Sequence, residues 1–314
     1  MIVDCEARIW DLRGVDFQDP DIASFWDAMM DHGRILTRER EELRKLVTPD
    51  DLVAMMDRQG IDHACLTSFA FPTVMGDDFD PGELVLQAVE QHPERITGYI
   101  SLSPQRRGAL DEVTRWAERG IKAVSIYPPE GFYADDPRIS YPFYERCLEA
   151  GVDTVFIHVG LQSQPQLELK YAHPLHLDAV ARDFPQLNFV CEHFAYPWEA
   201  DLIAVAWKHK NVFICCTYLA AMLPWAPGPM WHAVGRALRD LGGSEQLVWG
   251  SDWAFWTERS VADQIAALKD FRIPEAHREE WGYPEITPEV RDGLLGGNAA
   301  RLFGLVPSDA TVGG

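Results

Sequence analysis

Eight short apolar runs, rich in β-branched residues, constrain the fold of this chain more than any other feature. Each run ends at a polar residue or at a Gly/Pro break, and amphipathic stretches lie between the runs. The runs are 1–10, 61–69, 95–103, 121–128, 152–160, 187–194, 211–218 and 246–253. This alternation predicts parallel strands joined by helices, because parallel neighbours need a long crossover connection.

Helical periodicity occurs between the runs, at 80–92, 109–120, 142–151, 174–184 and 199–209. Gly120 and Gly151 stand where helix C-caps belong, directly before the next strand. Eight strands fit a closed, deformed (β/α)8 TIM barrel better than an open doubly wound sheet, which usually has about five to seven. We therefore predict an α/β barrel, with residues 1–314 forming one domain. The segments 11–60 and 219–235 follow strands and are expected to be enlarged loops at the C-terminal face, where barrels place active sites.

Composition excludes several classes of protein. Apolar residues make up 47% and charged residues 25% of the chain, as in ordinary globular proteins. The 28 Lys and Arg against 49 Asp and Glu give a net charge of −21, which argues against nucleic acid as a partner. Six scattered cysteines form no C-x-x-C pair, so they are expected in the core of a protein from a reducing compartment. No leader pattern, long apolar run or phosphate-binding glycine motif occurs, so we expect a cytoplasmic protein without membrane or dinucleotide binding.

Reactive side chains stand at the carboxyl ends of four predicted strands. Glu6 and Arg8 end the first, His158 the fifth, His193 the sixth and Asp252 the eighth. A single buried histidine is more often a core residue than a ligand, but all these strand ends meet at one rim of a barrel. Imidazole and carboxylate together suit a divalent ion such as zinc, which lowers the pKa of bound water to about 7.

Further side chains are candidates for substrate binding. Tyr127 and Phe132 follow the fourth strand, His173 precedes a helix, and Trp253 follows Asp252. Aromatic side chains line small-molecule pockets, but they serve equally in core packing and in subunit contacts. The 11 tryptophans are also compatible with a homo-oligomer.

Several stretches together resemble the amidohydrolase superfamily, in particular the amidohydrolase-related branch with aminocarboxymuconate-semialdehyde decarboxylase. They are 120–137, 156–160, 174–193, 247–256 and 297–304. The resemblance implies a deformed barrel holding one divalent metal ion, commonly zinc, through two first-strand residues, a fifth-strand histidine and an eighth-strand aspartate. The matching positions are Glu6, Arg8, His158 and Asp252, and His193 matches a histidine near the substrate or the metal.

The first strand departs from this family pattern, because relatives carry His-x-His or Glu-x-His where this chain has Glu6 and Arg8. Arginine has no lone pair to offer and cannot ligate a metal. In one interpretation the remaining residues still bind the ion, and Arg8 clamps a substrate carboxylate. In the other, Arg8 takes the place of the ion, pairs with Glu6 or Asp252, and polarises the substrate itself. A guanidinium beside an ion needs compensating carboxylates, which Glu6, Asp252 and Glu192 offer.

The predicted function is a metal-dependent hydrolase acting on a small carboxylated or carbonyl compound, with Asp252, His193 and Arg8 as catalytic residues. One alternative is non-oxidative decarboxylation of an aromatic or related acid. A metal-free, lactonase-like enzyme and a non-catalytic ligand-binding barrel are the others. All these interpretations require the four strand ends to share one cavity.

Overall fold

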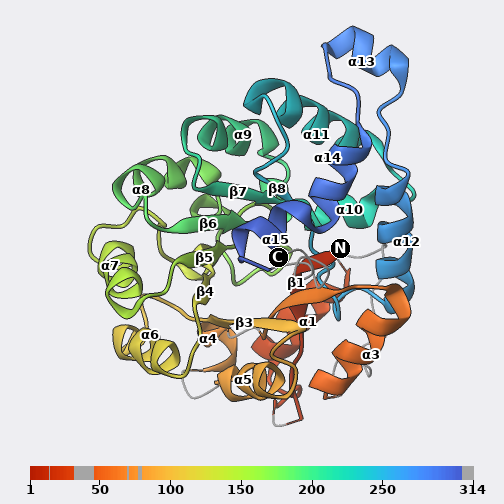
Figure 1. The fold of residues 1–314 in the computed structure, drawn as a ribbon. Coiled ribbons are helices and arrows are strands. Elements are labelled where there is room, and N and C mark those ends of the chain that lie inside the picture. Colours follow the sequence, from red (N-terminus) through yellow and green to blue (C-terminus); the bar gives the residue numbers. More distant parts are fainter. Residues whose placement is uncertain (14, 32–45, 69–70, 77–79, 306–314) are drawn as a thin grey trace, which may run out of the picture.

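The computed structural model describes residues 1–13, 15–31, 46–68, 71–76 and 80–305. Eight parallel strands follow one another in sequence order, which confirms the predicted TIM barrel (Figure 1). They are β1 (Val3–Arg8), β2 (His63–Thr67), β3 (Ile96–Ser101), β4 (Ala123–Ile126), β5 (Thr154–Ile157), β6 (Asn188–Cys191), β7 (Val212–Cys215) and β8 (Leu247–Val248). All eight lie within the predicted apolar runs.

The barrel closes between β1 and the chain that follows β8. The backbone N–H of Cys5 donates to the Trp249 carbonyl at 2.9 Å, and that of Asp252 donates to the Glu6 carbonyl at 2.7 Å. β8 itself is only two residues long, shorter than the predicted run, and the chain turns at Asp252 with a φ of 54°. The first and last strand ends, which carry candidate residues, are therefore joined by main-chain hydrogen bonds.

The helices cover the outside of the strands, and α13 projects furthest from the barrel (Figure 1). They are α1 (Pro20–Asp31), α3 (Pro49–Gln59), α4 (Pro72–Met75), α5 (Gly82–Gln91), α6 (Ala109–Glu118), α7 (Ser140–Ala150), α8 (Leu177–Asp183), α9 (Glu199–Lys208), α10 (Thr217–Met222), α11 (Gly228–Leu241), α12 (Glu258–Lys269), α13 (Glu275–Trp281), α14 (Pro288–Asp292) and α15 (Asn298–Leu302). The αL residue Gly151 caps α7, as predicted, and its N–H bonds to carbonyls of the last turn.

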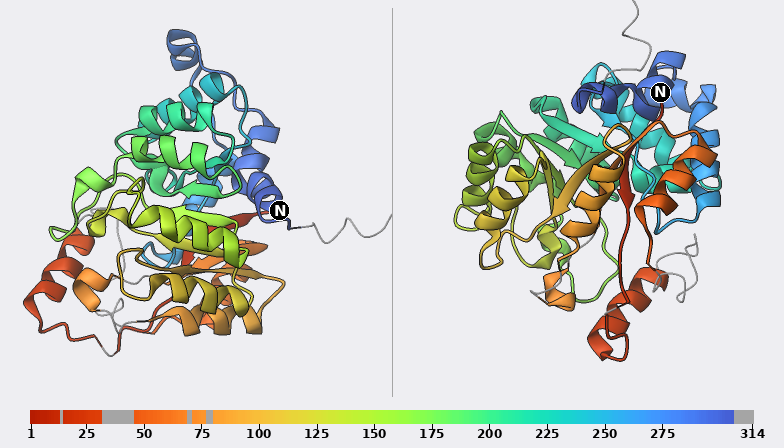
Figure 2. Two further views of the ribbon diagram at one scale, coloured as in Figure 1. Left: turned by 90° about the vertical axis from the view of Figure 1, so that its left-hand side faces the viewer. Right: turned by 60° about the horizontal axis from the view of Figure 1, so that its bottom comes forward.

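Both predicted loops contain helices. Much of 219–235 belongs to α10 and α11, because a proline in the first turn of α11 starts a helix rather than breaking it. The segment 11–60 contains α1 and α3, and residues 32–45 of it lie outside the described residues. Figure 2 shows α1 at one end of the barrel and the N-terminus, close to α15, at the other. Since β1 runs toward α1, that end is the carboxyl-end face.

The barrel interior is filled by side chains rather than hollow. Tyr99 stacks on Phe156 with ring centroids 3.9 Å apart, and Phe156 stacks on Phe303 at 6.0 Å. All six cysteines are free and buried, as predicted. Because this packing closes the interior, chemistry is confined to the carboxyl-end rim. None of the helices in the described part of the chain has the length and hydropathy needed to cross a bilayer.

Candidate functional site

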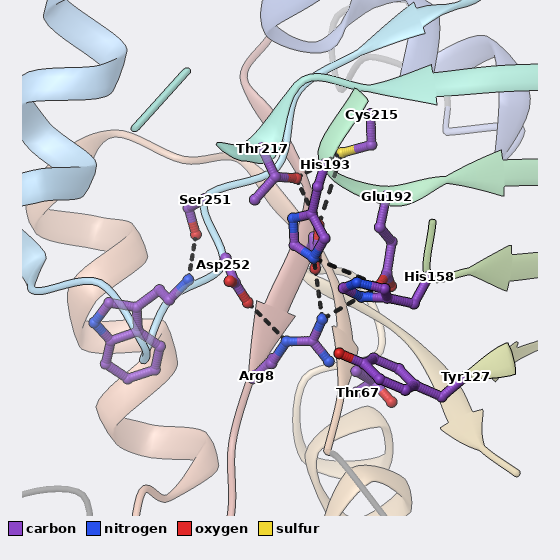
Figure 3. A network of polar contacts seen from close by, with 12 residues as sticks. Arg8, Thr67, Tyr127, His158, Glu192, His193, Cys215, Thr217, Ser251 and Asp252 are labelled. Carbon is purple, nitrogen blue, oxygen red and sulfur yellow. Dashed lines mark hydrogen bonds and ion pairs between the residues drawn. The ribbon is translucent and has the colours of Figure 1, made fainter. Parts of the chain in front are cut away.

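The Arg8 guanidinium lies among three carboxylates at the carboxyl-end rim (Figure 3). Its Nη2 is 2.5 Å from Glu6 Oε1 and 3.6 Å from Glu192 Oε2, and its Nε donates to Asp252 Oδ1 at 2.7 Å. The Arg8 side chain is only 9% exposed. Residues from β1 and from the turns after β6 and β8 thus form one buried ion-pair network.

Two imidazoles complete this cluster. The rings of His158, after β5, and His193, after β6, have centroids 4.6 Å apart. His158 Nδ1 is 3.4 Å from Glu192 Oε2, and His193 Nε2 is 3.8 Å from Glu6 Oε1. The four strand ends identified from the sequence therefore share one site.

Unusual backbone conformations place two of these side chains. His193 has a φ of 59°, and the next two residues, Phe194 and Ala195, are also left-handed, as is Asp252 with a φ of 54°. Such conformations cost on the order of 1 kcal/mol or more per non-glycine residue. Phe194 and Ala195 are completely buried, and the packing of this turn offsets the cost. The turns redirect the chain so that His193 and Asp252 face Arg8 (Figure 3).

Glu6 has a partner at each carboxylate oxygen. Arg8 binds Oε1, and the Thr217 hydroxyl donates to Oε2 at 2.5 Å. Burial by itself would raise the pKa of Glu6, but His193, Arg8 and Thr217 together outweigh burial and lower it. Burial would likewise lower the pKa of Arg8, but Asp252, Glu192 and Glu6 raise it well above its ordinary value. Glu6 and Arg8 therefore form a permanent buried ion pair.

Burial shifts the pKa values of the other titratable groups toward their neutral forms, and Arg8 opposes this shift at the two carboxyl groups. Burial, followed by the charge of Glu6, raises the pKa of Glu192 to about 7. The pKa of Asp252 is also raised well above its ordinary value, mainly by burial and against the opposing effect of Arg8. Burial lowers the pKa of His158 to about 3 and that of His193 to about 4, so both imidazoles are neutral near pH 7. The site therefore offers one strong cation, neutral imidazoles and carboxyl groups that can exchange protons.

Two groups of side chains have the spacing to hold a metal ion, since their ligand atoms lie within 4.8 Å of one another. They are His158, Glu192 and His193, and Glu6, His193 and Asp252. Arg8 contacts a carboxylate of each group. A divalent ion about 4 Å from a guanidinium is repelled by roughly 8 kcal/mol at an effective dielectric constant near 20. The carboxylates that would have to compensate for this repulsion already contact Arg8, so with Arg8 in this place the residues do not fit the ion that the family commonly holds.

Some of the predicted substrate-binding residues lie at the site, and others lie away from it. Tyr127 joins the site, because its ring centroid lies 4.2 Å from that of His158. Trp253 is buried beside Asp252, and its backbone N–H donates to Ser251 Oγ at 3.0 Å. Phe132 is instead buried in the core between strands and helices.

His173 also lies outside the cluster. Its Nε2 is 3.6 Å from Asp201 Oδ2, and its ring packs on Trp198 at a centroid distance of 5.0 Å. The sequence placed His173 just before a predicted helix, from where it was expected to reach the pocket, but it packs on the start of α9 instead.

Three residues of the site were not identified from the sequence. Thr217 binds Glu6, and Gln162 contacts His158 and Tyr127. Asp4 accepts hydrogen bonds from the Ser251 backbone and hydroxyl at 2.8 and 2.5 Å, which secures the turn before Asp252. The strand periodicity, which places Asp4 on the same side as Glu6, could have indicated Asp4. No periodic signal marks loop residues such as Gln162.

A TIM barrel that gathers titratable side chains at its carboxyl-end rim has the arrangement of barrel enzymes. The family model described as Amidohydrolase matches residues 3–305. The chain therefore belongs to the amidohydrolase family.

Individual relatives are distant in sequence. L-fucono-1,5-lactonase of Burkholderia ambifaria is 24% identical over 296 residues, which is 89% of this chain and 92% of that protein. An uncharacterized TIM-barrel protein from Bordetella bronchiseptica superimposes with a TM-score of 0.69 at 20% identity, over 97% of this chain and 98% of the other. An amidohydrolase from Burkholderia multivorans with bound zinc gives a TM-score of 0.59 at 15% identity, over 98% and 100% of the two chains. These solved structures show that the fold is shared with this chain. The bound zinc belongs to the Burkholderia multivorans protein.

Proposed function

We propose that this chain is a hydrolase of cyclic esters in which the Arg8 guanidinium replaces the metal ion. The observation that carries the proposal is the position of Arg8, within 3.6 Å of carboxylates from three strand ends. A buried guanidinium supplies a fixed positive charge where negative charge develops on a carbonyl oxygen during ester hydrolysis. This geometry favours the second of the two interpretations drawn from the first strand.

Arg8 and Asp252 divide the chemistry between them. None of the described residues forms a hydrogen bond or ion pair with Arg8 Nη1, so this nitrogen can donate to the substrate carbonyl. Asp252 takes a proton from water as the oxygen attacks the carbonyl carbon. The tetrahedral intermediate then collapses, the ring C–O bond breaks, and Asp252 returns the proton to the leaving oxygen. The hydrogen bond from Arg8 Nε favours the ionised form of Asp252 that this role requires, and the pKa raised by burial makes the ionised carboxylate a stronger base than an ordinary aspartate.

The charges of the site favour an uncharged lactone over a carboxylate-bearing substrate. Arg8 already pairs with Glu6 and Asp252 and approaches Glu192, so a substrate carboxylate would bring a further full negative charge into a cluster of carboxylates, whereas a lactone carbonyl needs only the Nη1 donor. The curated relative is named for hydrolysis of a sugar lactone, which is such an uncharged ring ester. We therefore expect hydroxylated lactones to be better substrates than dicarboxylates.

A zinc-dependent hydrolase is the second candidate. Its support is the spacing of His158, Glu192 and His193, whose ligand atoms lie within 4.8 Å of one another. Binding an ion there requires Arg8 to move away from Glu192. The two candidates differ in whether activity depends on a metal.

One set of assays tests the proposal. Protein purified without chelator is analysed for metals, then assayed with aldonolactones, linear esters, anilides and aromatic acids, the last for carbon dioxide release. Lactone hydrolysis that persists at substoichiometric metal content and after chelation supports the proposal. The Asp252→Asn variant is expected to lower kcat by about 10²- to 10⁴-fold, whereas Asp263→Asn, at an exposed position on α12, is the matched control. Activity that tracks bound zinc, or decarboxylation without lactone hydrolysis, contradicts it.

A further inference from the structure

Two serines lie side by side at the carboxyl ends of β3 and β4, strands that contribute no charged side chain to the cluster around Arg8. Ser101 is the last residue of β3, and Ser125 is the last but one of β4. The two residues are partners in the parallel pairing of these neighbouring strands (Figure 1). The Leu102 N–H donates to the Ser125 carbonyl at 2.8 Å, so the strands remain hydrogen-bonded to this level. The sheet therefore fixes the positions of both serines.

Strand alternation directs both serines into the barrel. Ser101 lies two residues after Tyr99, whose ring stacks on Phe156 in the barrel interior. Ser125 lies two residues before Tyr127, whose ring packs within the site. Alternate residues of a strand point to the same side, so Ser101 and Ser125 face the interior as well. They stand above the layer of Tyr99 and Phe156, at the level of the carboxyl-end rim.

Solvent reaches this part of the interior. Ser101 is half-buried and Ser125 is 7% exposed, whereas Tyr99 below them is completely buried. Since both serines point inward, their exposure comes through the mouth of the barrel. Among the described residues, no hydrogen bond involves either serine side chain. Buried hydroxyl groups nearly always have a hydrogen-bond partner, so these two require one from outside the chain.

The Tyr99 hydroxyl is a second observation that indicates a ligand here. It is completely buried and has no hydrogen-bond partner in the described part of the chain. Burial raises the pKa of Tyr99 well above its ordinary value, the charge of Glu192 adds to the rise, and Arg8 opposes it. Because these charges act on the hydroxyl, it lies at the end of the ring that faces the site. Three hydroxyl groups without partners therefore converge beside the charged cluster.

The chemistry of these groups identifies the kind of ligand. A serine hydroxyl both donates and accepts a hydrogen bond, so it complements another hydroxyl group. β3 and β4 contain no cationic side chain that would select an anion instead. A ligand that is apolar in this region would leave the buried hydroxyl groups unpaired, which is unfavourable. The wall formed by Ser101 and Ser125 thus fits a neutral, hydroxylated ring.

We infer that Ser101 and Ser125, above the Tyr99 hydroxyl, form a subsite for the hydroxyl groups of a sugar-like ring. The inference deepens the proposed function and rests on it for the ester carbonyl, which lies at Arg8 Nη1 in that proposal. Binding of a hydroxylated ring, by contrast, is measurable without turnover.

Isothermal titration calorimetry with a sugar lactam tests the subsite. A lactam has the ring and hydroxyl groups of the lactone, but its amide bond is hydrolysed far more slowly. We expect Ser101→Ala and Ser125→Ala each to weaken lactam binding by about 10-fold, as is typical for loss of one hydrogen bond. The matched control is Ser260→Ala on α12, outside the barrel, which should bind like the wild-type protein. No lactam binding by the wild-type protein, or unchanged affinity in both subsite variants, overturns the inference.

Deoxy lactams, each without one ring hydroxyl, separate direct contact from a structural disturbance. If a serine binds one particular hydroxyl, its replacement by alanine should not weaken binding of the lactam that lacks this group. Other lactams should still lose affinity in the same variant. Equal losses for every lactam in the series would show that the substitution disturbs the site as a whole, which contradicts the inference.

Kinetics with the matching lactones distinguish this inference from the proposed function. If lactam binding depends on the serines but the wild-type protein hydrolyses no lactone, the proposed function fails and the inference stands. If the wild-type protein and both variants hydrolyse hydroxylated lactones with equal kcat/KM, the inference fails and the proposed function stands.

Discussion

The Arg8 side chain determines the chemistry available at the rim of this barrel. A guanidinium keeps its charge at any physiological pH and offers donors but no lone pair. Three carboxylates surround it, and removal of one partner from such a buried cluster typically costs about 3–5 kcal/mol, because unpaired charge remains. Arg8 is therefore important for stability as well as for the proposed catalysis.

Replacing Arg8 with histidine should convert the site into a metal site. The Arg8→His variant removes the repelling cation and adds a nitrogen ligand beside Glu6, His193 and Asp252. We expect the variant to bind about one zinc ion per chain, whereas the wild-type protein retains substoichiometric zinc after the same dialysis. Elemental analysis and isothermal titration calorimetry measure this difference.

The control for that experiment is Arg13→His, because Arg13 is 66% exposed and pairs only with Asp11 among the described residues. Equal zinc affinity in the wild-type and Arg8→His proteins would show that Arg8 does not exclude the ion.

Asp4 should make stability depend on pH. Burial raises the pKa of Asp4 from 3.8 to about 7, because its hydrogen bonds from Ser251 offset burial only in part. A raised folded-state pKa means that the folded protein holds this proton more tightly, so the stability contribution is complete below about pH 4 and is lost as the pH rises toward 7. The unfolding free energy of Asp4→Asn minus that of the wild-type protein should therefore increase by a few kcal/mol as the pH rises from about 4 to about 7.5.

Urea unfolding of both proteins across this pH range measures the effect. Asp263→Asn, at an exposed position, should follow the wild-type curve. A constant difference in unfolding free energy between Asp4→Asn and wild type at all pH values contradicts a raised Asp4 pKa.

At the scale of elements, close backbone approach at the ends of β1 and β8 positions the site. A Cβ added at Gly250 would lie 2.6 Å from Glu6 Cβ and 3.0 Å from Thr217 Oγ1, so β1 and the chain after β8 meet without space for a side chain. The carboxylate of Glu6 is therefore placed by the same contact that closes the barrel.

Gly250→Ala should both destabilise the protein and impair the site. Overpacking of this kind typically costs about 1–3 kcal/mol, and here it displaces Glu6 from Arg8 and Thr217. Thermal unfolding and lactone kinetics measure the two effects. The matched control is Gly228→Ala at the start of α11, where an added Cβ meets no atom of the described residues within 4 Å. Equal melting temperatures and equal kinetic constants for the two variants would show that the close backbone approach at Gly250 does not determine stability or the position of Glu6.

At the scale of the whole molecule, the net charge of −21 opposes compaction through self-repulsion. Salt screens this repulsion between exposed charges far more than it weakens the buried network around Arg8. We expect the free energy of unfolding to rise by roughly 1 kcal/mol between about 0.02 M and 0.5 M NaCl.

Urea titrations at several concentrations of NaCl and KCl check this expectation, and agreement between the two salts shows that screening is responsible. A steady loss of stability with added salt would mean that surface ion pairs, rather than repulsion, dominate the exterior.

The amino-acid sequence by itself determined the barrel and the members of the central cluster. Strand and helix periodicities are local properties, so the eight strands are visible without tertiary information. Parallel strands of a barrel also end at one rim, so Glu6, Arg8, His158, His193 and Asp252 could be grouped from their positions alone.

Only the tertiary structure decided how these side chains pair. Arg8 and Asp252 are 244 residues apart, and their contact depends on barrel closure and on a left-handed turn at Asp252. Loops have no periodicity, so the helices within 219–235 and the reach of Gln162 to His158 left no signal in the sequence. Arg8 can act either beside a metal ion or in place of one, and distances of a few ångströms decide between these two chemistries. Such distances follow from packing rather than from local propensity.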